Sequence, residues 1–151
     1  MRVAVGADHA GFELKRDLAG ALAQQGHEIL DLGTHSSAPV DYPDIAEAVA
    51  TAVRNGQVDR GIIVCGSGAG VAVAACKFPG VRAAVCHDCY TARQAVEHDD
   101  VNVLCLGARV IGPALARTLV ETFLAATFNA EERHMRRVAM IEAIESKFTK
   151  E

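Results

Sequence analysis

Short apolar runs alternate with longer segments of mixed polarity along the whole chain. The apolar runs are unbroken, rather than alternating with polar residues at every second position. Unbroken runs are typical of strands that are buried on both faces of a sheet. We predict strands at residues 2–6, 28–32, 61–65, 81–86 and 101–106.

The segments between these runs carry apolar residues at helical spacing. Leu14, Leu18 and Leu22 lie on one face of a predicted helix that ends before Gly26, a favourable residue just beyond a helix C-terminus. A second helix has Pro43 in its first turn and ends before Gly56. We predict the other helices at residues 71–78, about 90–97, 113–124 and 131–148.

Alternating strands and helices of this kind predict an α/β fold. We expect a three-layer αβα, Rossmann-like domain with a five-stranded parallel sheet and an extra C-terminal helix. No linker, repeat or low-complexity segment divides the chain, so one domain should span residues 1–151. Ligands bind such sheets beyond the carboxyl ends of the strands, near the point where the strand order reverses.

The last predicted helix, residues 131–148, is highly charged. Arg133, Arg136 and Arg137 lie on neighbouring turns, because positions three and four apart share a helix face. Two interpretations remain open. The helix is either solvated and stabilised by its own ion pairs, or it reaches over a partner subunit.

Composition and charge narrow the class of protein. The chain has 151 residues, of which 50% are hydrophobic and 23% charged, enough for one compact domain with its own core. A net charge of −4 gives no electrostatic footprint for nucleic acid. Met1 leads directly into an apolar strand, and no apolar run reaches membrane-spanning length. We therefore expect a cytoplasmic protein that binds neither nucleic acid nor membranes.

The chain has five cysteines, an odd number without a secretion signal, so reduced thiols are expected. Cys86 and Cys89 have the CxxC spacing of zinc and redox sites. No second pair of Cys or His residues completes a metal site, and Cys86 falls at the end of a predicted strand. We predict no metal site.

A run of small residues, Cys65-Gly66-Ser67-Gly68-Ala69-Gly70, follows the third strand and precedes a helix. Without bulky side chains, an anion can approach the backbone N–H groups at the start of that helix. Cys65 would face the same pocket, where a helix N-terminus favours a reactive thiolate. A buried, inert cysteine is the alternative.

Other polar residues also fall just past strand ends, or in the turns and helix ends beyond them. We expect them to converge at one edge of the sheet. The set comprises Asp8, His9, Cys65, Ser67, His87, His98 and Arg109.

Five segments in order resemble the ribose-5-phosphate isomerase B family, which includes galactose-6-phosphate isomerase subunits. They are residues 6–11 (GADHAG), 41–43 (DYP), 65–70 (CGSGAG), 102–109 (NVLCLGAR) and 133–137 (RHMRR). The resemblance covers nearly the whole chain. It implies a metal-free aldose–ketose isomerase that needs no cofactor and acts on a phosphorylated sugar through an enediolate.

The resemblance implies a role for each catalytic residue. Cys65 corresponds to the thiolate base; one family branch uses a glutamate just after the glycine loop, where this chain has Val71. His98 matches the histidine that opens the sugar ring, and a surface histidine at a helix end is the alternative. Ser67 matches a hydroxyl that hydrogen-bonds the reacting oxygens, although it could also cap the helix. The enediolate oxygen would be held by backbone N–H groups of Gly66, Ser67, Gly68, Ala69 and Gly70.

Substrate contacts are implied in the same way. Asp8 and His9 match residues that touch the sugar hydroxyls and the phosphate, and Asp8 is equally suited to cap the first helix. Tyr42 would form a wall of the site. Asp99 stands where the family usually has Asn, and it could orient His98 or accept from a sugar hydroxyl. The phosphate-binding arginines would be Arg109, Arg133 and Arg137.

Family sites are assembled across a dimer interface, so we expect a homodimer or a dimer of dimers in which the C-terminal helix packs on a partner. Ribose 5-phosphate and ribulose 5-phosphate are the expected substrate pair. Allose 6-phosphate, galactose 6-phosphate and a non-catalytic phosphometabolite-binding module remain as alternatives.

Overall fold

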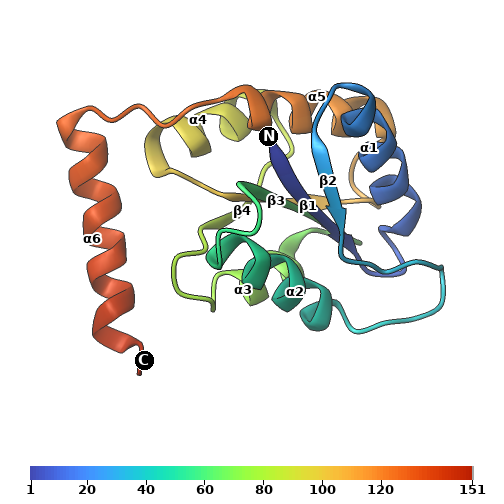
Figure 1. The fold of residues 1–151 in the computed structure, drawn as a ribbon, viewed down its shortest axis with the longest axis horizontal. Coiled ribbons are helices and arrows are strands. Elements are labelled where there is room, and N and C mark those ends of the chain that lie inside the picture. The colour runs from blue at the N-terminus through green and yellow to red at the C-terminus, as the bar shows by residue number, and fades with distance from the viewer. Residues whose placement is uncertain (151) are drawn as a thin grey trace.

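The computed structural model describes residues 1–150. Strands and helices alternate along the chain and form a parallel sheet between two helix layers, followed by a separate terminal helix (Figure 1). The elements are β1 (Arg2–Ala7), α1 (Phe12–Gln24), β2 (Glu28–Asp31), α2 (Tyr42–Arg54), β3 (Arg60–Cys65), α3 (Ala69–Ala75), β4 (Ala83–Val85), α4 (Cys89–Asp99), β5 (Val103–Gly107), α5 (Pro113–Ala125) and α6 (Glu132–Phe148). This architecture confirms the predicted fold class.

The order of the strands decides which loops become neighbours. The five strands lie in the order β2-β1-β3-β5-β4 and every pair is parallel. The order reverses between β1 and β3, where Ala7 pairs with Val64. β5 lies between β3 and β4, so Cys65 pairs with Gly107. The carboxyl ends of β1, β3 and β5 are therefore adjacent.

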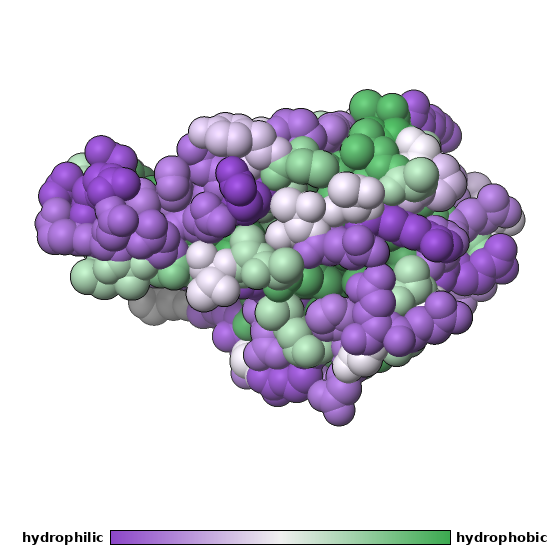
Figure 2. All heavy atoms as spheres, turned by 90° about the horizontal axis from the view of Figure 1, so that it is seen from above, coloured by the Kyte–Doolittle hydropathy of each residue, from purple (hydrophilic) through white to green (hydrophobic). Residues whose placement is uncertain are grey.

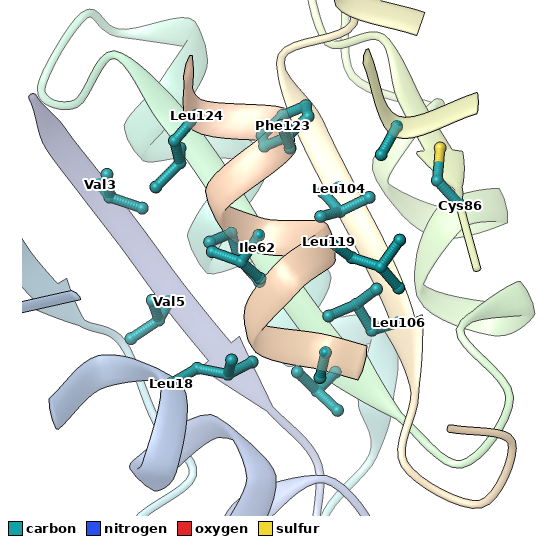
Figure 3. Close-up of a cluster of buried hydrophobic side chains, with 14 of the residues drawn as sticks. Val3, Val5, Leu18, Ile62, Cys86, Leu104, Leu106, Leu119, Phe123 and Leu124 are labelled. Atoms are coloured by element: carbon teal, nitrogen blue, oxygen red, sulfur yellow. The ribbon is translucent and has the colours of Figure 1, made fainter. Parts of the chain in front are cut away.

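Successive residues of each strand point to opposite faces of the sheet and fill two separate cores. On one face, Ile62 and Val64 pack with α1, α4 and α5, and Figure 3 shows Leu119 and Phe123 of α5 over the strands. On the other face, Cys65 packs with α2 and α3. Since a strand with two buried faces must be apolar throughout, the unbroken apolar runs follow directly from this arrangement.

The clearest differences from the predicted boundaries are in α3, β4 and β5. The third helix spans residues 69–75 rather than 71–78, and Pro79 disfavours a helical conformation at the residue before it. β4 and β5 begin two residues later than expected. There the Arg82 N–H donates to Oδ1 of Asn102 (2.8 Å), so a side chain takes a bond that a longer strand would give to the sheet.

α6 stands apart from the sheet and packs mainly on α4 (Figure 1). A backbone hydrogen bond from Asn129 N–H to Glu97 O (2.8 Å) ties the linker before α6 to α4. In Figure 2, α6 projects to the left and mixes hydrophilic with apolar residues. Its exposed apolar side chains are Met135, Met140, Ile141, Ile144 and Phe148. Within residues 1–150, none of the helices is both long enough and apolar enough for a membrane span.

Candidate active site

A hollow of about 500 Å³ opens at the carboxyl ends of β1, β3 and β5, beside the point where the strand order reverses. Ligands of open α/β sheets bind at such a position. Its lining residues are Asp8, Tyr42, Cys65, Gly66, Ser67, Gly70, Arg109 and Val110. Besides Cys65, the candidate base, six residues that the sequence predicted for the site line this hollow. Val110 also lines it, although the sequence did not indicate this residue.

Cys65 is the last residue of β3, is only 5% exposed and forms no disulfide. The N–H of Gly68 donates a hydrogen bond to its Sγ atom (3.1 Å). A backbone donor aimed at sulfur stabilises negative charge there. Among the other buried thiols, burial raises the pKa of Cys86 to about 11 and raises the pKa of Cys105 well above its usual value. Those two thiols stay protonated at neutral pH.

The glycine loop presents backbone donors to the hollow. Gly68 has a positive φ (+82°), which favours glycine, and serves as the N-cap of α3. The Ala69 N–H donates to Ser67 Oγ (3.1 Å), which leaves the hydroxyl hydrogen of Ser67 free to donate. Within residues 1–150, the Ser67, Gly70 and Val71 amides donate to no protein group.

The prediction that every amide of residues 66–70 faces the ligand is therefore wrong in part. The Gly68 and Ala69 amides are occupied by Cys65 Sγ and Ser67 Oγ. The first amides of a helix have no intrahelical acceptor, which is why the remaining ones are available to an anion.

Two glycines allow the walls of the hollow to approach closely. A Cβ atom on Gly70 would lie 2.6 Å from the ring of Tyr42, the first residue of α2. A Cβ atom on Gly107 would lie 2.7 Å from backbone atoms of Ser67. Both distances are shorter than van der Waals contact. The Tyr42 side chain could shift, but the Ser67 backbone could not easily do so, so the loop after β3 fits closely against β5 only with glycine at position 107.

Arg109 is held beside the candidate base by the loop that follows β5. The Ala108 N–H donates to Cys65 O (2.8 Å), and the Arg109 N–H donates to Gly66 O (3.0 Å). The exposed guanidinium of Arg109 lies next to Gly66, where a Cβ would be 3.5 Å from one of its nitrogens. A fixed positive charge at the rim suits a phosphate group.

Asp8 and His9 follow β1. Asp8 is 7% exposed, and its Oδ1 accepts from the N–H groups of Ala10 (3.0 Å) and Gly11 (3.1 Å). It thus organises the turn before α1, whose N-cap residue is Gly11. Nδ1 of His9 accepts from the Val40 N–H (3.2 Å), so in the neutral ring the proton sits on Nε2.

His98 and Asp99 lie at the opposite edge of the sheet. They end α4, and the next residue, Asp100, accepts through its backbone oxygen from Arg82 just before β4 begins (2.7 Å). The strands between the two edges have five or six residues, which at about 3.3 Å per residue separates the edges by about 16–20 Å. The prediction that His98 converges with Cys65 in one chain is wrong.

The physical reason is the path of the chain. In a parallel sheet each helix runs back from the carboxyl edge to the edge where the strands begin, so a residue at the end of a helix lies far from the strand ends. Arg133 and Arg137 are exposed on α6, which packs on α4 rather than on the hollow. Arg133 forms an ion pair with Glu131.

Two histidines without a specific role in the sequence analysis form defined contacts in the structure. Nε2 of His87 accepts from the Gly107 N–H (3.0 Å) and supports the turn that carries Arg109. His134 is 1% exposed, and its ring stacks on His98 with 4.2 Å between ring centroids. The signal for His134 was its spacing of four from the buried Val138, which places both on the covered face of α6.

In the described part of the chain, residues 1–150, no cluster of three or more His, Cys, Asp or Glu side chains is arranged to bind a metal ion. The groups that line the hollow include the Cys65 thiol, the Ser67 hydroxyl, the Asp8 carboxylate and the Arg109 guanidinium.

A Rossmann-like sheet that carries a thiol, free loop amides and an arginine at its switch point is the kind of α/β protein that binds anionic small molecules. The Ribose/Galactose Isomerase family model matches residues 3–141, and the chain belongs to that family.

Similar proteins agree with this assignment. Ribose-5-phosphate isomerase B of Escherichia coli (strain K12) is 45% identical over 97% of this chain and 97% of its own length. The structure of Clostridium thermocellum ribose-5-phosphate isomerase B has a TM-score of 0.96 and 48% identity, and covers 99% of this chain and 100% of that one. Ribose-5-phosphate isomerase B from Mycoplasma genitalium, solved with bound ribulose-5-phosphate, has a TM-score of 0.91 and 38% identity, with 98% and 97% of the two chains covered.

Proposed function

We propose that this chain is an aldose–ketose isomerase that interconverts ribose 5-phosphate and ribulose 5-phosphate through an enediolate. The observation that carries the proposal is the position of Cys65 Sγ, which lines the same hollow as Arg109 and the glycine loop. The relatives and solved structures named above support the substrate pair.

The reaction moves one proton between neighbouring carbons and one between the oxygens that these carbons carry. The Cys65 thiolate takes the proton from C2 of the open-chain aldose, and the electron pair forms the C1–C2 double bond of the enediolate. The same thiol returns a proton to C1. The hydroxyl on C2 loses its proton as it becomes a carbonyl, and the oxygen on C1 gains a proton and becomes a hydroxyl. The free Ser67, Gly70 and Val71 amides and the Ser67 hydroxyl stabilise the developing negative charge on oxygen.

Other residues of the hollow, and His9 in the turn after β1, bind the rest of the sugar phosphate. The Nε2–H of His9 and the guanidinium of Arg109 are donors for phosphate or hydroxyl oxygens. Asp8 accepts from a sugar hydroxyl and contacts the reacting end, and Tyr42 closes one side of the hollow. Because sugar phosphates are charged and do not cross membranes freely, we place the protein in the cytoplasm with its substrate.

A second copy of the chain completes the site in our proposal. His98 lies about 16–20 Å from the edge that carries Cys65, beyond the reach of one pentose phosphate. In a two-fold symmetric homodimer, His98, Asp99, Arg133 and Arg137 of each subunit would serve the partner's hollow.

The surface beside α6 supports this arrangement. A groove of about 690 Å³ runs between α6 and the segment before β4, and it includes Ile141, Ile144 and Phe148. The last two side chains are 62% and 77% exposed, which is unusual for large apolar residues unless a partner covers them.

The proposal is tested by isomerisation of ribose 5-phosphate by the purified chain, with allose 6-phosphate and galactose 6-phosphate assayed in parallel. We expect turnover of the pentose phosphate to exceed that of both hexose phosphates. The Cys65→Ala variant should lose about 10²–10⁴-fold in kcat and in exchange of the C1 hydrogen of ribulose 5-phosphate with solvent.

Cys89→Ala, which removes an exposed thiol outside the hollow, is the matched control and should keep full activity. Turnover of a hexose phosphate alone would keep the mechanism and change the substrate. Activity of Cys65→Ala equal to that of the wild type would exclude the thiolate mechanism, and no turnover of any sugar by the wild type would leave only a binding function.

A further inference from the structure

We propose that His134 is a positioning residue for His98, and that the stack between the two rings governs the rate of sugar ring opening. The inference rests on the proposed function, because it gives His98 its role in ring opening. The stack itself is an observation of the fold and can be tested without activity.

The His134 ring has one fixed orientation. Its side chain is 1% exposed, and its Nδ1 lies 3.0 Å from the backbone oxygen of Asn129. A carbonyl oxygen can only accept, so Nδ1 carries a proton and donates it. The plane of His134 is thereby held, and the His98 ring lies on it with 22° between the planes and 4.2 Å between centroids.

The same short linker holds the backbone next to His98. The Asn129 N–H donates to the oxygen of Glu97, the residue before His98 (2.8 Å). Asn129 thus binds α4 through its N–H and His134 through its carbonyl. Backbone and ring of His98 are both tied to one segment, so His134 restrains a half-buried side chain at a helix end that would otherwise change rotamer freely.

Ring opening needs a well-placed acid and base. The bond between C1 and the ring oxygen breaks, a carbonyl forms at C1, a proton leaves the C1 hydroxyl and a proton reaches the former ring oxygen, so no net proton is gained. A transferring imidazole must lie within hydrogen-bond distance of these oxygens. A displacement of about 1 Å can cost about 100-fold, so loss of the stack should cost about 10–100-fold in this step.

Ribulose 5-phosphate separates ring opening from the carbon–hydrogen chemistry. Its C2 carbonyl cannot close a five-membered ring, because the oxygen on C5 carries the phosphate. Exchange of its C1 hydrogen with solvent therefore reports Cys65 without ring opening, whereas isomerisation that starts from ribose 5-phosphate includes it.

Two substitutions separate the effect of the His134 ring from that of its hydrogen bond to Asn129. His134→Gln keeps a donor for Asn129 but has no ring, and we expect a 10–100-fold loss of ribose 5-phosphate isomerisation with exchange within about twofold of wild type. His134→Phe keeps a flat ring and should restore most of the isomerisation. Arg136→Gln, an exposed change on α6 outside the site, is the control and should match the wild type. An equal loss of both rates in His134→Gln, or no loss of either, would overturn the proposal.

The ring protons of His98 in an NMR spectrum give the independent readout. The stacked ring of His134 shifts them upfield, and His134→Gln should remove that shift while His134→Phe keeps one. An unchanged His98 spectrum in His134→Gln would overturn the stack. An inactive wild type with the shift present would instead contradict the proposed function and leave the contact in place.

Discussion

The local environment of each buried thiol separates a candidate base from inert cysteines. Cys65, Cys86 and Cys105 all come from apolar strand segments, but only Cys65 lines a hollow and accepts a backbone N–H on its sulfur. The sequence could predict this residue from its place before a glycine loop. It could not predict which amides are free, because that depends on whether Cys65 Sγ and Ser67 Oγ take them first.

A single charge near the substrate is tested by Asp99→Asn. Asp99 is exposed at the end of α4, and in the proposed dimer it faces an anionic substrate. At about 8 Å and an effective dielectric constant of about 40, removal of one negative charge is worth about 1 kcal/mol, or about fivefold in affinity. We expect KM for ribose 5-phosphate to fall about fivefold with kcat unchanged, as measured by steady-state kinetics.

Glu47→Gln changes the net charge equally on an exposed part of α2 and should leave KM unchanged. A rise in KM in Asp99→Asn would show instead that the carboxylate accepts a hydrogen bond from the sugar.

At the scale of elements, the sequence predicted every strand and helix but not the order of the strands. β5 inserts between β3 and β4, so the loop that carries Arg109 lies against the loop after Cys65. Apolar runs are alike in composition and do not say which strands pair. The ends of β4, β5 and α3 were also misplaced, since Asn102 and Pro79 act through contacts and conformations that periodicity does not report.

The close fit of these two loops is tested by Gly107→Ala. The new methyl would lie 2.7 Å from the backbone of Ser67, which cannot move aside as a side chain can. We expect a loss of about 1–3 kcal/mol in the free energy of unfolding, measured in urea, and at least a tenfold fall in kcat/KM.

Gly20→Ala is the matched control, because nothing lies within 4 Å of its Cβ position in α1. Helix propensity predicts that it stabilises the protein by about 0.5–1 kcal/mol, with kcat/KM unchanged. If both variants unfold at the same urea concentration, the contact at Gly107 is not tight.

At the scale of the molecule, the free energy of unfolding should depend on pH in the acidic range. The Thr91 backbone N–H, which bonds the side chain of the N-cap residue Asp88, holds the pKa of Asp88 below its usual value. Hydrogen bonds from Arg2 and Arg117 lower the pKa of Asp59 and of Asp17, respectively. A carboxyl whose pKa is lower in the folded chain than in the unfolded chain, where it is about 3.9, stabilises the fold fully at pH values above about 3.9. This stabilisation is lost as the pH falls through the pKa of the folded state.

We therefore expect the urea midpoint to be constant from pH 7 to about pH 5 and to fall below about pH 4. Asp88→Asn keeps a capping side chain that does not titrate, so its midpoint should fall less over the same range. Equal slopes for both proteins, measured by circular dichroism, would exclude a contribution from Asp88.

The largest difference between the sequence-based prediction and the structure is the position of His98 relative to Cys65. His98 was expected beside Cys65 because both fall at or beyond predicted strand and helix ends, but in a parallel sheet α4 ends at the far edge, about 16–20 Å away. In the proposed dimer each chain therefore contributes to two sites, and two variants can test whether the sites are shared. Cys65→Ala and His98→Asn should each be inactive alone as homodimers.

If the two variants are unfolded together and refolded as an equal mixture, half of the dimers are mixed, and each mixed dimer has one site with both native residues. We expect about one quarter of wild-type activity to return, since half of the dimers each carry one of two sites. Recovery requires that Cys65 and His98 act from different subunits. The contrary outcome is a refolded mixture that stays inactive while a wild-type sample treated in the same way recovers. It would mean that Cys65 and His98 of the same chain act together, which contradicts a site shared between subunits.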